Sequence, residues 1–202
     1  MKKNKLLYTL LLVISIFPLW SSIKDYQSAK VQYKVLGEVN SANNLLTREN
    51  YELLKKQDKS YPNLTITALP MYSIEAFYDI SFGDYKSALY NTIRAKGINP
   101  YIMFNESLMS DIYKKIGLKD SAQYYARIAF KNLPGNEKHF MQYANLLIEE
   151  NQIPELISVY FSSDFKTRDI FKKIFLSGVA GKNIKNRKVD SLALSLIDSQ
   201  NA

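Results

Sequence analysis

The feature that most constrains this chain is a repeat with a period of 34 residues. Four residues of one stretch recur in the same order at that single spacing. The pairs are Gly83 and Gly117, Ala88 and Ala122, Ala95 and Ala129, and Pro100 and Pro134. Self-similarity at a period of about 20–50 residues is typical of stacked repeats. Two unrelated helical hairpins, which are the alternative, would have no reason to keep a common period.

Each recurring residue type suits a helix–turn–helix unit. Gly83 and Gly117 follow amphipathic runs, where the chain needs a residue that tolerates positive φ in order to turn back. The paired alanines are seven residues apart, on one face of a second helix, and small side chains there allow close helix packing. Because proline cannot continue a helix, Pro100 and Pro134 are expected to stop that second helix.

This pattern resembles the tetratricopeptide repeat (TPR), a helix–turn–helix unit that stacks into a solenoid. The resemblance covers about residues 70–163, and it implies an all-α, TPR-like α-solenoid that acts by binding. In this family the first helix of each unit lines a groove that holds a protein or peptide partner. Matching the 34-residue frame implies the groove residues Ser73, Phe77, Ile80, Ser107, Asp111, Lys114, Met141, Asn145 and Ile148.

The N-terminus has the composition of a membrane segment. Three lysines within the first five residues precede Leu6–Trp20, an uncharged and mostly apolar run. A cleaved signal peptide needs small residues before the cut, whereas Leu19 and Trp20 are bulky. We therefore favour an uncleaved transmembrane helix over residues 1–23. The lysines would hold the N-terminus in the cytoplasm, which predicts a single-pass protein of the inner (cell) membrane with an extracytoplasmic, periplasmic C-terminal domain.

The remaining residues divide into three predicted segments. Residues 24–69 are expected to form a juxtamembrane helical pair, or a diverged repeat, with Tyr26, Ala29, Tyr33 and Leu36 forming one apolar stripe. Residues 70–164 carry the repeats. Residues 165–202 are expected to form capping helices, because a solenoid needs atypical helices to cover its exposed end.

Composition and motifs argue against catalysis. The chain has no cysteine and a single histidine, His139, which we expect at the surface. These residues cannot supply a convincing metal site or an activated nucleophile. No glycine-rich phosphate loop and no Gly-x-Ser-x-Gly elbow occurs. We therefore expect no enzyme, no cofactor and no metal.

The net charge of +8 allows acidic partners. Basic residues gather near the C-terminus and predict a basic face made of Lys172, Lys173, Lys185, Arg187 and Lys188. Such a face could bind anionic lipid or acidic glycan, or it could simply keep a terminal cap soluble. Nucleic acid is not expected, because no aromatic-interleaved recognition motif is present.

A second resemblance concerns the order of the segments. A membrane span, a helix, the pair Tyr61-Pro62 and then repeats is similar to the C-terminal tail of bacterial O-antigen ligase or polymerase-like membrane proteins. The multi-span catalytic part is missing here, so this resemblance implies a non-catalytic accessory of surface-polysaccharide assembly. The main hypothesis is a membrane-anchored extracytoplasmic scaffold or adaptor for protein–protein interaction.

Overall fold

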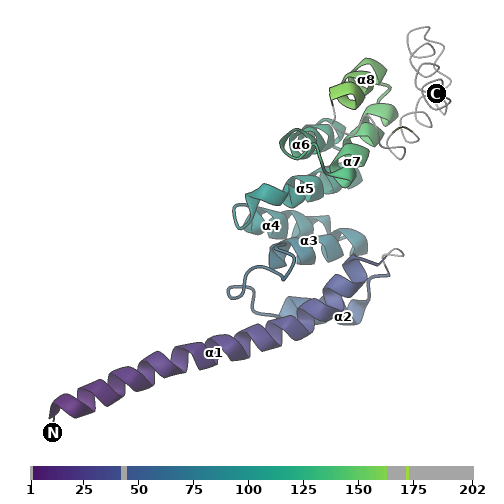
Figure 1. Ribbon diagram of the computed structural model, residues 1–202. Helices are drawn as coiled ribbons and strands as arrows, with labels where there is room; N and C mark the ends of the chain where they lie inside the picture. Colours follow the sequence, from purple (N-terminus) through teal and green to yellow (C-terminus); the bar gives the residue numbers. More distant parts are fainter. Residues whose placement is uncertain (1, 42–44, 163–171, 173–202) are drawn as a thin grey trace. The chain divides into compact units, whose positions relative to one another are not determined.

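The computed structural model describes residues 2–41, 45–162 and 172, and within them it contains helices and no strand (Figure 1). The all-α fold class is therefore confirmed. The chain divides into unit 1, Met1–Pro100, and unit 2, Tyr101–Ala202. The helices of unit 1 are α1 (Lys2–Val39), α2 (Arg48–Lys56), α3 (Met71–Phe82) and α4 (Tyr85–Ala95). Those of unit 2 are α5 (Phe104–Lys115), α6 (Lys119–Asn132), α7 (Glu137–Glu149) and α8 (Ile153–Ser162).

Helix α1 packs on the rest of unit 1 only through its C-terminal half. Val35 and Leu36 are buried there, and so is the polar side chain of Gln32. The stripe predicted from Tyr26 to Leu36 is not a single packed face, because Tyr26 is 62% exposed and Tyr33 is 85% exposed. Hydrogen bonds explain why the inward face of α1 differs from the predicted stripe. Gln32 donates to Ser28 at 2.9 Å and accepts the backbone N–H of Ile66 at 2.9 Å. With its hydrogen bonds satisfied, Gln32 can face inward.

Between Tyr8 and Trp20, α1 is exposed on all sides. Every described side chain between Tyr8 and Trp20 is exposed, including those of seven large aliphatic residues and Phe17. Within the described residues, no helix is both long enough and apolar enough to cross a membrane. The predicted membrane segment covers residues 1–23, and the side chains of residues 1–7 lie outside the described part of the chain.

The connection between α2 and α3, residues 57–70, packs along α1. Lys24 of α1 forms an ion pair with Asp58 at 3.0 Å, and the ring of Trp20 stacks on that of Tyr61 with 5.8 Å between centroids. Within this connection the described backbone forms one isolated bridge, between Leu64 and Pro70. The connection therefore holds α1 to unit 1 well beyond the helix's buried face.

The core of unit 1 is formed by α1, α2 and α3. Its largest fully buried side chains include Tyr51, Leu54, Ile74 and Tyr78. The rings of Tyr51 and Tyr78 stack in parallel with 5.9 Å between centroids. Helix α2 begins after the N-cap residue Thr47, whose side chain accepts the backbone N–H of Asn50.

The hairpins α3–α4 and α5–α6 contain the recurring residues. Gly83 and Gly117 adopt positive φ angles of 82° and 83°, as the sequence predicts for the two turns. The four recurring alanines are fully buried between packed helices: Ala88, Ala95, Ala122 and Ala129. These observations agree with a helix–turn–helix unit repeated at 34 residues.

The expected helix stop at Pro100 is wrong. Helix α4 already ends at Ala95, and Gly97 follows with a φ of 90°. Pro100 instead begins a short 3-10 helix, η1 (Pro100–Ile102). The glycine, with no Cβ to oppose a left-handed conformation, ends the helix before the proline is reached. By contrast, Pro134 lies two residues after the end of α6 at Asn132, beyond the C-cap Leu133, as predicted.

The core of unit 2 is formed mainly by α6, α7 and α8. Phe130 of α6 contacts Phe140 and Tyr143 of α7, with centroids 5.9 and 6.0 Å apart. Between α7 and α8, Asn151 adopts a φ of 59° at the position that lies one period after Gly117. The predicted capping helices over residues 165–202 lie outside the described residues, apart from residue 172.

Candidate interaction surface

Helices α5 and α7 lie side by side in unit 2 and are joined by polar side chains (Figure 1). Gln142 of α7 donates to the carbonyl of Ser107 at 2.9 Å and to the carboxylate of Asp111 at 2.7 Å. Further along, Lys114 forms an ion pair with Glu149 at 2.7 Å. The partners are 31–35 residues apart, close to the repeat period. The first helices of two consecutive hairpins therefore form one surface.

All six groove residues that were predicted in unit 2 lie on these two helices. Ser107 and Asp111 are half-buried in the contact between the helices, whereas Lys114 is exposed. Along α7 the others share one side, at spacings of four and three residues: Met141 and Ile148 are half-buried and Asn145 is exposed. We name these six residues and Gln142 the α5–α7 surface.

The α5–α7 surface combines a half-buried carboxyl, that of Asp111, with the exposed ion pair of Lys114 and Glu149. Burial raises the pKa of Asp111, although the hydrogen bond from Gln142 and the nearby Lys114 act in the opposite direction. The ion pair of Lys114 with Glu149 is about half exposed, so its contribution to stability is small, about 0–1 kcal/mol. A partner can therefore displace this ion pair at little cost.

The three groove residues predicted in unit 1 lie on α3. Ser73 is fully buried, so it cannot contact a partner in this conformation. Phe77 and Ile80 are half-buried, and the hydroxyl of Ser81 donates to the carbonyl of Phe77 at 3.0 Å. The usable part of the predicted groove in unit 1 is therefore limited to two apolar side chains.

Of the predicted basic face, the structure describes only Lys172. That side chain is 7% exposed, so it adds little charge to a solvent-facing surface. Lys173, Lys185, Arg187 and Lys188 lie outside the described residues.

The expectation that His139 lies at the surface is wrong, because it is only 3% exposed. The residue lies in the first turn of α7, where Asn136 caps its backbone N–H. The ring turns inward, and its Nε2 donates to the carbonyl of Ile102 at 3.3 Å. Burial lowers the pKa of His139 and favours the neutral ring. No group of three or more His, Cys, Asp or Glu that could hold a metal ion occurs among the described residues.

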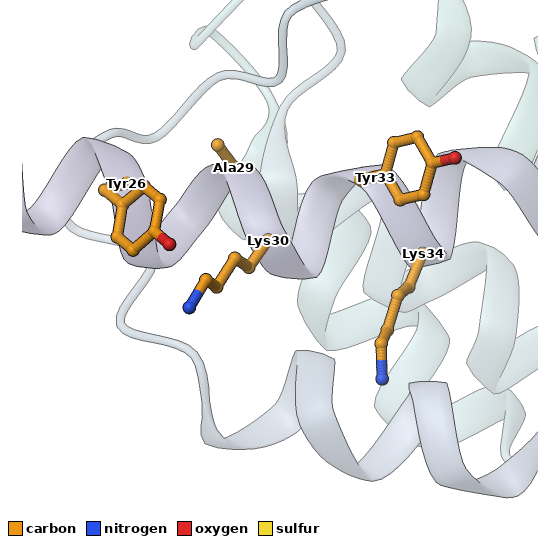
Figure 2. Close-up of a pocket in the computed structure, with 5 residues that line it drawn as sticks. All are labelled: Tyr26, Ala29, Lys30, Tyr33 and Lys34. Atoms are coloured by element: carbon orange, nitrogen blue, oxygen red, sulfur yellow. The ribbon is translucent and has the colours of Figure 1, made fainter.

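A second exposed surface, which the sequence did not identify as a site, lies on the outer face of α1. A hollow of about 440 Å³ is lined by Tyr26, Ala29, Lys30, Tyr33 and Lys34 (Figure 2). Figure 2 shows Ala29 between the two tyrosines, so the hollow lies where the small side chain leaves space between two rings. The ammonium group of Lys30 lies over the ring of Tyr26, 4.4 Å from its centroid. The spacing of Tyr26, Ala29 and Tyr33 is the sequence signal for this surface.

In comparisons with known proteins, no family model matches this chain, and no curated protein or solved structure matches it.

Proposed function

We propose that this protein is a membrane-anchored helical-repeat scaffold that binds a protein or peptide partner on the α5–α7 surface. The hydrogen bonds between α5 and α7 at about one repeat period carry this proposal. A TPR-like solenoid also places the first helices of successive units next to each other, and it binds on the surface that they form. The mixture of apolar and polar side chains on this surface suits a peptide or a partner helix.

The exposed half of α1 supports the anchor. Large apolar side chains cover all sides of this helix between Leu10 and Ile23, and a helix that is apolar all round is suited to an apolar environment. Trp20 and Tyr61 stack where the apolar half ends, and amphipathic aromatic rings are favoured at a membrane–water boundary. In this proposal the helices that follow α1 lie outside the cytoplasm.

A capture experiment tests the binding surface. The full-length tagged chain is solubilised from envelopes in mild detergent, and co-purifying proteins are identified for the original chain and for two variants. Asn145→Arg adds bulk and charge to the α5–α7 surface, so it should abolish capture of the partner. Asn132→Arg makes the same exchange at an exposed position of α6, so it should leave capture unchanged.

Two further measurements separate the alternatives. Binding through a basic surface should be lost at about 0.5 M salt, where the Debye length is only about 4 Å, whereas apolar contacts should persist. If salt releases the partner and Asn145→Arg does not, the scaffold proposal is wrong. Binding of an anionic ligand to a basic surface would then explain the capture. Extraction of envelopes at alkaline pH tests the anchor separately, because an anchored chain stays in the pellet.

A further inference from the structure

The outer face of α1 has the geometry of a helix-packing seam. Leu19, Ser22, Tyr26, Ala29 and Tyr33 recur at alternating spacings of three and four residues, and all five are exposed. This is the heptad pattern of a coiled coil, in which a seam of two positions per seven residues faces another helix. The face that packs on unit 1 is marked by Gln32 and Val35, which lie on a different side of α1. We name the five exposed residues the α1 seam.

The hollow in Figure 2 matches the space that such a packing requires. In a coiled coil each seam residue enters a hole formed by four residues of the facing helix. Four of the lining residues, Tyr26, Ala29, Lys30 and Tyr33, have the spacing of such a hole: the first residue and those three, four and seven positions later. Ala29 forms its floor, so a side chain from a second helix can approach the backbone. The hollow therefore fits a helix.

The charges beside the α1 seam indicate which second helix packs against it. Asp25 and Lys30 border the seam on opposite sides and are five residues apart. In a parallel pair of identical helices, a residue on one side of the seam meets the residue five positions later on the other helix. Asp25 of each copy would then meet Lys30 of the other. Neither residue forms an ion pair within the described part of the chain, whereas Lys24 and Lys34 do.

We propose that α1 pairs with α1 of a second copy of this chain, in parallel and in register along the α1 seam. An antiparallel pair would not bring Asp25 to Lys30, so the charges alone favour the parallel arrangement. In this pairing each seam residue meets the same residue of the second copy. Pairs of tyrosines alternate along the seam with pairs of the small residues Ala29 and Ser22, and the rings of both copies fill the space that the small residues leave. This pairing does not depend on the α5–α7 surface. It is compatible with a membrane anchor but does not require one.

Disulfide cross-linking tests the pairing, because the full-length chain contains no cysteine. Single cysteines are placed at each position from 22 to 33, envelopes and detergent extracts are oxidised, and dimers are measured on non-reducing gels. We expect the dimer fraction to peak at Ser22, Tyr26, Ala29 and Tyr33. It should be several-fold lower at Gln27, which is equally exposed but lies away from the seam.

Charge reversal identifies the partner as a second copy. With cysteine at position 29, Asp25→Lys and Lys30→Asp should each reduce the dimer, and the double variant should restore it. A cross-linking pattern without helical periodicity, a maximum at Gln27, or adducts formed only with another protein would overturn the proposal. So would a double variant that fails to recover. Fractionation of the same samples shows whether the chain is anchored, so failure of the anchor and failure of the pairing give different results.

Discussion

At the scale of single residues, buried polar groups determine much of this structure. In unit 1, the carboxylate of Asp79 is fully buried and accepts hydrogen bonds from the Tyr51 hydroxyl and, at 2.8 Å, from the Asn91 amide. Burial, together with the hydrogen bond to Asp79, raises the pKa of Tyr51 far above its usual range. Because each donor comes from a different helix, Asp79 joins α2, α3 and α4 through one side chain.

Replacing Tyr51 by phenylalanine should therefore destabilise unit 1. The ring packing would remain, but one oxygen of a buried carboxylate would lose its donor, at a cost of about 1–3 kcal/mol. Chemical denaturation followed by circular dichroism measures the change. The control is Tyr90→Phe on α4, where the ring is 60% exposed and the expected change is within about 0.5 kcal/mol. Equal stability of the two variants would show that the hydroxyl of Tyr51 does not hold Asp79.

His139 should make the stability of unit 2 depend on pH. Burial lowers its pKa in the folded state, so the unfolded chain binds a proton more readily below about pH 6.5. Stability should consequently fall as the pH drops from about 6.5 towards the folded pKa. The variant His139→Gln, which does not titrate, should lose less stability than the original chain between about pH 7.5 and 5.5. Thermal melts at the two pH values measure this, and equal losses would contradict the buried neutral ring.

At the scale of elements, helix packing depends on the small residues at the recurring positions. Ala95 and Ala129 are fully buried where α4 packs on α3 and α6 packs on α5 and α7. Because protein interiors are close-packed, a larger side chain at either position would have to displace its neighbours. The repeat at 34 residues is therefore a repeat of contacts as well as of residue types.

Exchanging Ala95 or Ala129 for leucine should over-pack these contacts. The expected cost is about 1–3 kcal/mol for each variant. Lys86→Leu, at an exposed position of α4, should change stability by no more than about 0.5 kcal/mol. Thermal melts of the three variants provide the comparison. If the alanine variants melt at the same temperature as the lysine variant, the 34-residue frame does not describe the packing.

The elements were largely predictable, but the directions of several side chains were not. Periodicity and turn residues such as Gly83 and Gly117 placed the helices, because these signals are local in the sequence. The inward face of α1 was missed because Gln32 obtains its hydrogen-bond partner from the distant Ile66. His139 was placed at the surface for the same reason, since its partner is the carbonyl of Ile102. Hydrogen bonds between distant segments leave no periodic pattern in the sequence.

The candidate site was only partly predictable. Frame matching predicted Ser107 and Asp111 of α5, and the structure places both where α5 contacts α7. It missed Gln142, which joins the two helices, since a side chain that bridges two helices is not itself periodic. It also placed Ser73 in the groove although this side chain is fully buried.

At the scale of the whole molecule, the chain combines an apolar helix with helical hairpins, and each part has its own expected task. Helix α1 would anchor the protein and pair two copies along the α1 seam. Unit 2 would hold the partner on the α5–α7 surface. A pair of copies would present two such surfaces, and a partner with two matching sites would then bind more tightly than to one copy. The proposed function requires that the α5–α7 surface contacts a protein.

Site-specific photo-cross-linking in intact cells tests that claim most directly. A photoreactive amino acid replaces one exposed residue at a time in the full-length chain, at Lys114 or Asn145 on the α5–α7 surface and at Tyr124 or Asn132 on α6. We expect a discrete adduct of higher mass from Lys114 and Asn145, containing the same protein, and none from the two positions on α6. Adducts only from α6, or none from any position while the chain is expressed and folded, would show that the α5–α7 surface does not contact a protein.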